Sequence, residues 1–228
     1  MRVVGVIPAA GYGTRLQPRD CSKEVYPIGG RPVMDYEIER MREAPCDELR
    51  VVTRPEKRDV IEHARRHGAV VVEGYPRSLG QSFYTGLKEL PDEDIVLMGF
   101  PDSVWEPVDG YRQVLEFMRA GGFDVALGLL PAPDMRREEP VLYDRSSGRV
   151  SRLEFKPEHP SADRTWACAV APVQILRGLE HEDEPGQFFN RICGERRVGA
   201  LPLQGDGMFL DMGTPKGLEH ALAALAAR

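Results

Sequence analysis

The chain has 228 residues, 42% hydrophobic and 29% charged, so it is long enough to build a substantial core. Its formal net charge of −6 argues against nucleic-acid binding, which usually needs a basic face, but allows a local basic pocket for a small anion. We find no run of about eighteen apolar residues and no apolar signal segment before the first expected strand. We therefore expect a cytoplasmic protein without a membrane partner.

The first expected strand, residues 2–7, leads into a small glycine-bearing segment. Gly11 and Gly13 would let backbone N–H groups approach an anion closely, and Arg15 and Lys23 follow with positive charge. The spacing is not that of a P-loop, and the third glycine of the dinucleotide fingerprint is absent. The two cations favour a phosphate-binding loop over an ordinary tight turn.

The first half of the chain alternates between short apolar runs and helical patterns. Strands are expected at 49–53, 69–72, 94–98 and 123–130, and helices at 33–44, 56–67, 78–90 and from 111 to the glycines at 121 and 122. This alternation is typical of a parallel sheet covered by helices on both faces.

The second half is richer in short strands. A β-hairpin is expected across 141–153, around a turn rich in Ser and Gly. Further strands are expected at 165–171, 200–203 and 208–210, with two helical stretches after 171 and a last helix from 215. We predict one α/β domain over 1–228, with a Rossmann-like, mostly parallel mixed sheet flanked by helices. The β-rich insertion would cover the carboxyl edge of the sheet, where ligands bind in such folds.

Two aspartates follow expected strands, and a lysine follows the hairpin. Asp102 and Asp211 could reach a metal ion from strand ends, since Mg²⁺ takes one or two protein carboxylates together with phosphate oxygens. Helix capping is the alternative for each, although Thr214 is better placed than Asp211 to cap the last helix. Lys156 precedes Pro157, which favours an extended backbone. Its alternative is an ordinary surface lysine.

The cysteines and histidines are assigned no chemistry. The four cysteines lack Cys-x-x-Cys spacing, which suits reduced thiols better than a disulfide framework or a zinc site. For the five histidines we identify neither a zinc-protease motif nor a paired spacing, so surface or helix-end positions are expected.

Taken in order, five elements of the chain resemble those of the sugar-phosphate nucleotidyltransferases, also called sugar-nucleotide pyrophosphorylases. The elements are the opening loop with its lysine at 11–18 and 22–27, the base-reading segment at 79–83, the first metal aspartate at 102, the lysine–proline element at 155–157, and the second metal aspartate in Asp-x-Gly-Thr-Pro at 211–215. The resemblance covers nearly the whole chain and is closest to the glucose-1-phosphate thymidylyltransferases.

This resemblance implies a nucleotide-diphospho-sugar transferase fold and a Mg²⁺-dependent reaction. A sugar-1-phosphate, or a related phosphate monoester, would attack the α-phosphorus of a nucleoside triphosphate and release pyrophosphate. In the implied site, the triphosphate is bound by Ala10, Gly11, Gly13, Thr14 and Arg15, the α-phosphate by Lys23 and the base by Gln81. Mg²⁺ is bound by Asp102 and Asp211, and Asp102 also contacts the nucleotide. The acceptor is bound by Glu139, Phe155 and Lys156. A homo-oligomer is left open, because the last helix carries an apolar stripe.

Three departures from the family pattern fall on the acceptor side. Phe155 stands where a Glu is usual, Glu139 and Pro140 replace a Tyr-Gly pair, and Ala169 replaces a glycine. The acceptor is therefore open. A cytidylyltransferase acting on a polyol, isoprenoid or other alcohol phosphate is one alternative, and a catalytically inactive nucleotide-binding regulatory protein is another. The nucleotide is open as well, since Gln81 could pair with several base edges.

Overall fold

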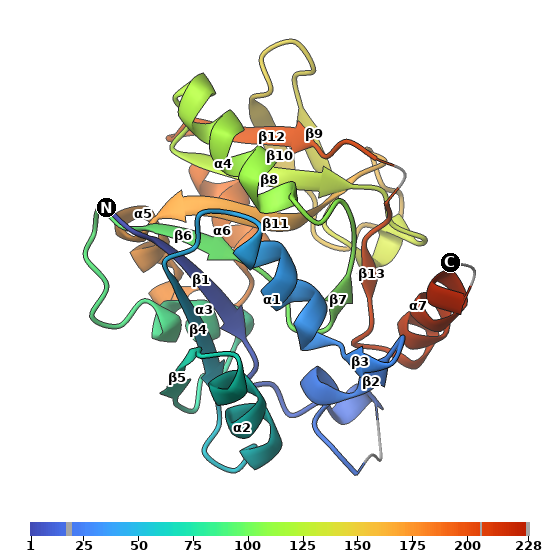
Figure 1. Ribbon diagram of the computed structural model, residues 1–228. Coiled ribbons are helices and arrows are strands. Elements are labelled where there is room, and N and C mark those ends of the chain that lie inside the picture. The colour runs from blue at the N-terminus through green and yellow to red at the C-terminus, as the bar shows by residue number, and fades with distance from the viewer. Residues whose placement is uncertain (17–19, 206, 227–228) are drawn as a thin grey trace.

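A seven-stranded mixed sheet forms the centre of the protein (Figure 1). The computed structural model describes residues 1–16, 20–205 and 207–226. In spatial order the strands are β12 (Val198–Pro202), β8 (Val125–Leu130), β11 (Thr165–Pro172), β6 (Ile95–Met98), β1 (Val3–Pro8), β4 (Glu48–Thr53) and β5 (Val70–Glu73). Only β11 runs antiparallel to its neighbours in this sheet, which confirms the predicted mostly parallel mixed sheet.

Helices cover both faces of the sheet because its strands are apolar on both sides. Along β1, Val4 and Val6 belong to one hydrophobic cluster, whereas Val3 and Ile7 belong to the other. The first cluster includes residues of α3 (Leu79–Gly86), α5 (Val173–Leu176) and α6 (Pro185–Ile192), and the second includes residues of α1 (Met34–Arg42), α2 (Arg58–Arg66) and α4 (Gly110–Gly121). The described residues contain no helix long and apolar enough to cross a membrane.

A third hydrophobic cluster brings the C-terminal part of the chain to its N-terminal part. Leu218 and Ala221 of α7 (Pro215–Ala226) pack with Leu16, Ile28 and residues of two short strand pairs. These pairs are β2 (Pro27–Ile28) with β3 (Arg31–Pro32), and β7 (Ser103–Val104) with β13 (Leu210–Asp211). In Figure 1, α7 lies beside the β2–β3 pair. Part of the apolar stripe of α7 is thus covered by its own chain.

The predicted hairpin forms, but its strands serve a different surface from the one expected. β9 (Val141–Tyr143) and β10 (Val150–Leu153) pair antiparallel and pack on α6 and β12. The segment before the hairpin and the lysine after it line the ligand-sized cavity described below, whereas β9 and β10 themselves do not.

Several element boundaries differ from the prediction. The strand expected at 208–210 begins only at Leu210, and the opening loop contains 3-10 helices at Thr14–Leu16 and Lys23–Val25. α2 is shorter than expected, and Gly68, with a φ of 68°, follows its end. No disulfide links the four cysteines.

We predict that Gly80→Ala destabilises the protein. A Cβ at Gly80 would lie 2.1 Å from the backbone oxygen of Glu182, and the Gly80 N–H already donates to the Asp183 carbonyl at 2.9 Å. Backbone cannot swing aside as a flexible side chain does, so the free energy of unfolding should fall by about 1–3 kcal/mol in chemical denaturation. The matched control is Gly194→Ala, where an added Cβ meets nothing within 4 Å. Equal losses in both variants would contradict this packing.

Candidate active site

A cavity of about 1080 Å³ lies at the carboxyl ends of β1 and β6. Of the predicted site residues, it is lined by Ala10, Gly11, Arg15, Lys23, Asp102, Glu139, Lys156 and Asp211. Gly13 lines a smaller adjoining hollow, while Thr14, Gln81 and Phe155 line neither. Gln17 and Pro18, the end of the opening motif, lie outside the described residues.

Lys23 and Asp102 form a buried ion pair at the cavity wall. The Lys23 Nζ lies 2.5 Å from Asp102 Oδ2, and the side chains are only 17% and 12% exposed. Burial acts to lower the pKa of Lys23 and to raise that of Asp102, but mutual attraction and their hydrogen bond outweigh it in both. The pKa of Lys23 is therefore raised and that of Asp102 lowered, so both groups are charged at neutral pH.

The loop that carries Lys23 is held by the start of α2. The Ser22 N–H and hydroxyl donate to the two carboxylate oxygens of Asp59 at 2.6 and 2.8 Å. Lys57 Nζ donates to the Ala9 carbonyl at 2.8 Å and to Glu24 Oε2 at 2.5 Å, and Glu24 is fully buried. These contacts fix Lys23 relative to the end of β1. The sequence does not predict these contacts, because a charged segment at the start of a helix usually indicates an exposed surface.

Asp211 reaches Asp102 through a short pairing of strands. β13 pairs with β7 so that Asp211 opposes Ser103, and the Met212 N–H donates to the Asp102 carbonyl at 2.9 Å. The Asp211 Oδ1 accepts from the Gly213 N–H at 2.7 Å. Thr214 Oγ1 instead accepts from the Gly217 N–H in the first turn of α7, at 3.0 Å. Thr214 is thus the helix cap, and Asp211 is left to face the cavity.

Both carboxylates converge on one point with Arg15. A Cβ built on Gly213 would lie 3.0 Å from Asp211 Oδ1 and 3.2 Å from both Asp102 Oδ2 and the Arg15 guanidinium. Burial and the nearby Asp102 charge raise the pKa of Asp211. Two carboxylates that repel each other across a small gap, which the absent Cβ leaves open, are a suitable donor set for a hard divalent cation. Asp102 and Asp211 therefore fit Mg²⁺.

Another part of the cavity is acidic, within electrostatic reach of Asp211 and Arg15. Glu138, Glu139 and Glu184 line it, and none forms an ion pair within 4.0 Å to a described residue. Glu139 Oε2 accepts from Trp166 Nε1 at 2.6 Å. Burial raises the pKa of both Glu138 and Glu139 to about 7. Lys156, Arg136 and Arg137 are cations that also line the cavity, and both arginines pair with Asp134.

The expectation that Lys156 has an extended backbone is wrong. Its φ is 42°, in the left-handed region, and its N–H donates to the Glu138 carbonyl at 3.0 Å. This tertiary hydrogen bond overrides the local preference set by Pro157. The Lys156 Nζ lies 4.7 Å from the centre of the exposed Phe155 ring.

The expected base-reading segment contributes to the cavity through other residues than Gln81. The Gln81 side-chain oxygen accepts from the Arg77 N–H at 3.0 Å and so closes its own turn. Leu79 and Ser82 line the cavity, and the buried Ser82 Oγ has no partner among the described residues. An unsatisfied buried hydroxyl facing a cavity is a natural ligand contact.

An aromatic pair with an arginine also lines the cavity. The Arg54 guanidinium lies 3.9 Å from the centre of the Tyr12 ring and 5.4 Å from that of Tyr75, and all three residues line the cavity. Arg54 Nε also donates to the Ala10 carbonyl at 2.7 Å. Flat side chains such as these can stack on a base. Only the fold brings Tyr12, Arg54 and Tyr75 together, so no local sequence pattern predicts this group.

The model of the MobA-like NTP transferase domain matches residues 5–164. The chain belongs to this family. The region of this NTP transferase that matches the family model includes Lys23, Asp102 and Lys156, whereas Asp211 lies outside it. The matched region thus includes the opening loop, whose Lys23 pairs with Asp102.

Relatives of this NTP transferase include named nucleotidyltransferases, some of them named for a sugar-1-phosphate. It is 25% identical over 165 residues to the low-salt glycan biosynthesis nucleotidyltransferase Agl11 of Haloferax volcanii, covering 68% of this chain and 45% of that protein. It is 26% identical over 236 residues to glucose-1-phosphate thymidylyltransferase of Neisseria gonorrhoeae, covering 95% of this chain and 80% of that protein. The chain thus spans less than half of the Haloferax protein.

A solved structure of UDP-glucose pyrophosphorylase complexed with UDP-glucose has the same fold. The TM-score is 0.82 at 18% sequence identity, and the match covers 100% of this chain and 99% of that one. At this identity the likeness establishes the nucleotide-diphospho-sugar transferase fold alone.

We predict that Glu139→Gln flattens the pH dependence of stability. Burial raises the pKa of the Glu139 carboxyl from 4.5 to about 7 in the folded protein. The folded state therefore holds the proton of this carboxyl more tightly than the unfolded state does. The resulting contribution of Glu139 to the free energy of unfolding is complete below pH 4.5 and is lost as the pH rises through about 7. Gln keeps an acceptor for Trp166 but does not titrate.

Urea unfolding of both proteins between pH 4 and 8 provides the test. The stability of the wild-type protein relative to Glu139→Gln should fall across this range by about 3 kcal/mol. A constant difference between the two curves would show that Glu139 titrates normally.

Proposed function

We propose that this NTP transferase joins the nucleotide of a nucleoside triphosphate to a sugar-1-phosphate and releases pyrophosphate. The observation that carries the proposal is the convergence of Lys23, Arg15, Asp102 and Asp211 on one end of the cavity. The cavity volume of about 1080 Å³ suits a nucleotide with its acceptor. The family and its named relatives support the same reaction.

The chemistry needs charge neutralisation and alignment more than a general base. The attacking phosphate monoester is already an anion, so the site must hold two anions together and stabilise the charge that passes to the leaving pyrophosphate. We assign the pyrophosphate to Arg15 and the backbone of 10–14, and the α-phosphate to Lys23. Mg²⁺ bound by Asp102 and Asp211 would supply further positive charge against the triphosphate.

The acidic end of the cavity is assigned to the acceptor. Lys156 would hold the acceptor's phosphate, while Glu138, Glu139 and Glu184 would accept hydrogen bonds from its hydroxyl groups. Glu138 and Glu139, with pKa values of about 7, can also donate when protonated. Phe155 stands at the position where the family pattern has a Glu, and it does not line the cavity. The acceptor would therefore not be contacted by a Glu at this position.

The same lining favours one alternative acceptor. Three carboxylates that pair with no described cation make a poor site for an isoprenoid chain, because an apolar chain would leave these carboxylates without water. They suit a polyol phosphate or an alcohol phosphate that bears an ammonium group. A cytidylyltransferase for such a polar alcohol phosphate is therefore the second candidate function.

The remaining assignments follow the chemistry of these substrates. We propose that the base is bound by Ser82 and by stacking on Tyr12 and Tyr75, rather than by Gln81. We further propose a cytoplasmic location, where reduced cysteines and phosphorylated substrates belong. No nucleic-acid or membrane partner is part of the proposal.

We predict that Lys23→Ala lowers turnover by at least about 100-fold, because the ammonium that faces the α-phosphate is lost. Lys23→Arg should keep the charge and the pairing with Asp102 but still lose most activity, since the guanidinium is larger and planar. The matched control is the exposed Lys88→Ala, which should retain turnover. Continuous pyrophosphate release measures all three, with near-UV circular dichroism to check folding. Near-normal turnover of Lys23→Ala would remove Lys23 from the proposed mechanism.

We predict that Gly213→Ala lowers turnover by on the order of 100-fold, with a change in stability below about 1 kcal/mol. The added methyl group would fill the gap between Asp102 and Asp211, whose side-chain oxygens can shift only slightly. The apparent Mg²⁺ concentration for half-maximal rate should rise in parallel. If Gly213→Ala has the Mg²⁺ dependence and turnover of the wild-type protein, the two carboxylates do not share a cation.

A substrate panel separates the candidate functions. Pyrophosphate release is measured with each nucleoside triphosphate against sugar-1-phosphates, polyol phosphates and ammonium-bearing alcohol phosphates. Release with a sugar-1-phosphate alone supports the first candidate, and release with CTP and a polar alcohol phosphate supports the second. Nucleotide binding without release for any pair would favour the regulatory protein and contradict both.

A further inference from the structure

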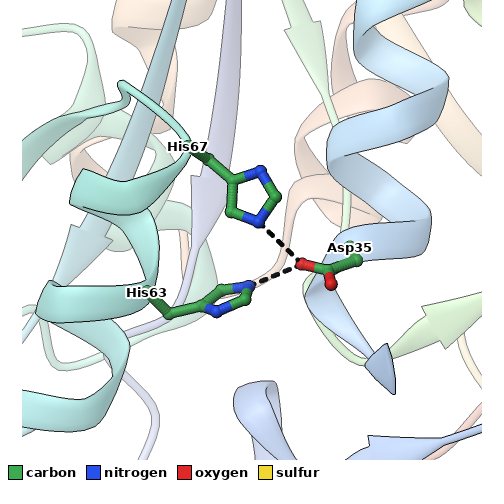
Figure 2. A group of neighbouring side chains, drawn as sticks. All are labelled: Asp35, His63 and His67. Carbon is green, nitrogen blue, oxygen red and sulfur yellow. Dashed lines mark hydrogen bonds and ion pairs between the residues drawn. The ribbon is translucent and has the colours of Figure 1, made fainter. Parts of the chain in front are cut away.

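Three side chains outside the cavity meet between α1 and α2 (Figure 2). His63 Nε2 lies 2.5 Å and His67 Nε2 3.0 Å from the same oxygen, Oδ1 of Asp35. The expectation that the histidines lack paired spacing is wrong, because His63 and His67 are four residues apart. At that spacing they lie on one side of α2, with Asp35 in the first turn of α1 facing both.

We propose that Asp35, His63 and His67 bind a divalent transition-metal cation such as Zn²⁺, at a site separate from the Mg²⁺ site. Two imidazoles and one carboxylate are a donor set that Zn²⁺ accepts readily and that Mg²⁺ does not favour. The three ligand atoms already lie within 4.8 Å of one another. The cation would replace the protons that the two Nε2 atoms now direct at Asp35.

The cluster needs little movement to accept the cation. Ligands about 2.0–2.1 Å from a tetrahedral Zn²⁺ lie about 3.3 Å apart. The present Asp35–His63 and Asp35–His67 distances of 2.5 and 3.0 Å would each have to widen by less than about 1 Å. The Asp35 and His67 side chains are 17% and 26% exposed, so water and ions can reach the site, and a water can serve as the fourth ligand.

Two arginines compete with the cation. The Arg66 guanidinium lies 3.3 Å from His63 Nδ1, and that of Arg42 lies 3.5 Å from His67 Nδ1 and 2.5 Å from the His67 carbonyl. A metal-bound imidazole carries its proton on Nδ1 and needs an acceptor there, which a guanidinium cannot be. Arg66 is exposed and free to rotate away on metal binding. The affinity of the wild-type site is thus reduced by its neighbours.

Metal binding here would act on structure rather than on the reaction. The cation would join the C-terminal end of α2 to the start of α1. The other end of α2 holds the Lys23 loop through Asp59 and Ser22. The site would therefore stabilise the scaffold that carries Lys23.

Calorimetric titration of chelator-treated protein with ZnCl₂, without nucleotide, tests the proposal. We expect one site and a rise in Tm on binding. His67→Gln, at the more exposed ligand, should bind Zn²⁺ at least about tenfold more weakly. His181→Gln, at an 87% exposed residue, and Asp211→Asn, at the proposed Mg²⁺ site, should both bind as the wild-type protein does.

Arg66→Gln supplies a gain-of-affinity test. Its amide oxygen can accept from the Nδ1–H of a metal-bound His63, and a repelling charge is removed, so Zn²⁺ should bind several-fold more tightly. Unchanged Zn²⁺ binding by His67→Gln, or loss of the tight site in Asp211→Asn, would overturn the proposal. Neither result depends on whether the protein transfers a nucleotide.

Discussion

The buried pair of Lys23 and Asp102 is the interaction around which the rest of the site is arranged. A largely buried lysine and aspartate remain ions here because their mutual attraction offsets the cost of burying each charge. The pair joins the loop after β1 to the end of β6, the two central strands whose carboxyl ends meet at the cavity. Asp59 and Lys57 hold the lysine side of this pair, while β13 brings Asp211 to the aspartate side.

The sequence predicts those parts of the site that are positioned by the pattern of strands and helices. Asp102 was expected at the cavity because the carboxyl ends of parallel strands share one edge of a sheet. The opening loop was expected there for the same reason. The approach of Asp211 depends on a pairing of two residues with β7, more than a hundred positions away along the chain, and no periodicity reveals such a contact. The backbone conformation of Lys156 was predicted wrongly, because a hydrogen bond from its N–H to the Glu138 carbonyl outweighs the effect of the following proline.

Charged residues that the fold buries were the least predictable. Glu24 is completely buried against Lys57, although its sequence neighbours are those of an exposed loop. His63 and His67 were expected at surface or helix-end positions, yet His63 is only 5% exposed because it faces Asp35 of α1. Both cases place a titratable group at a contact between segments. At such contacts the burial depends on the partner segment, which the helix's own pattern does not contain.

In the proposed reaction, the acceptor's phosphate attacks the α-phosphorus in a site centred on Lys23 and Asp102. The most direct test of this attack is ³¹P NMR of a reaction between a nucleoside triphosphate and an acceptor whose phosphate is labelled with ¹⁸O. Attack at the α-phosphorus predicts that all the label stays in a new diphosphate diester and none enters pyrophosphate. Release of an unlabelled nucleoside monophosphate with the labelled acceptor unchanged would mean hydrolysis by water, and would contradict the account.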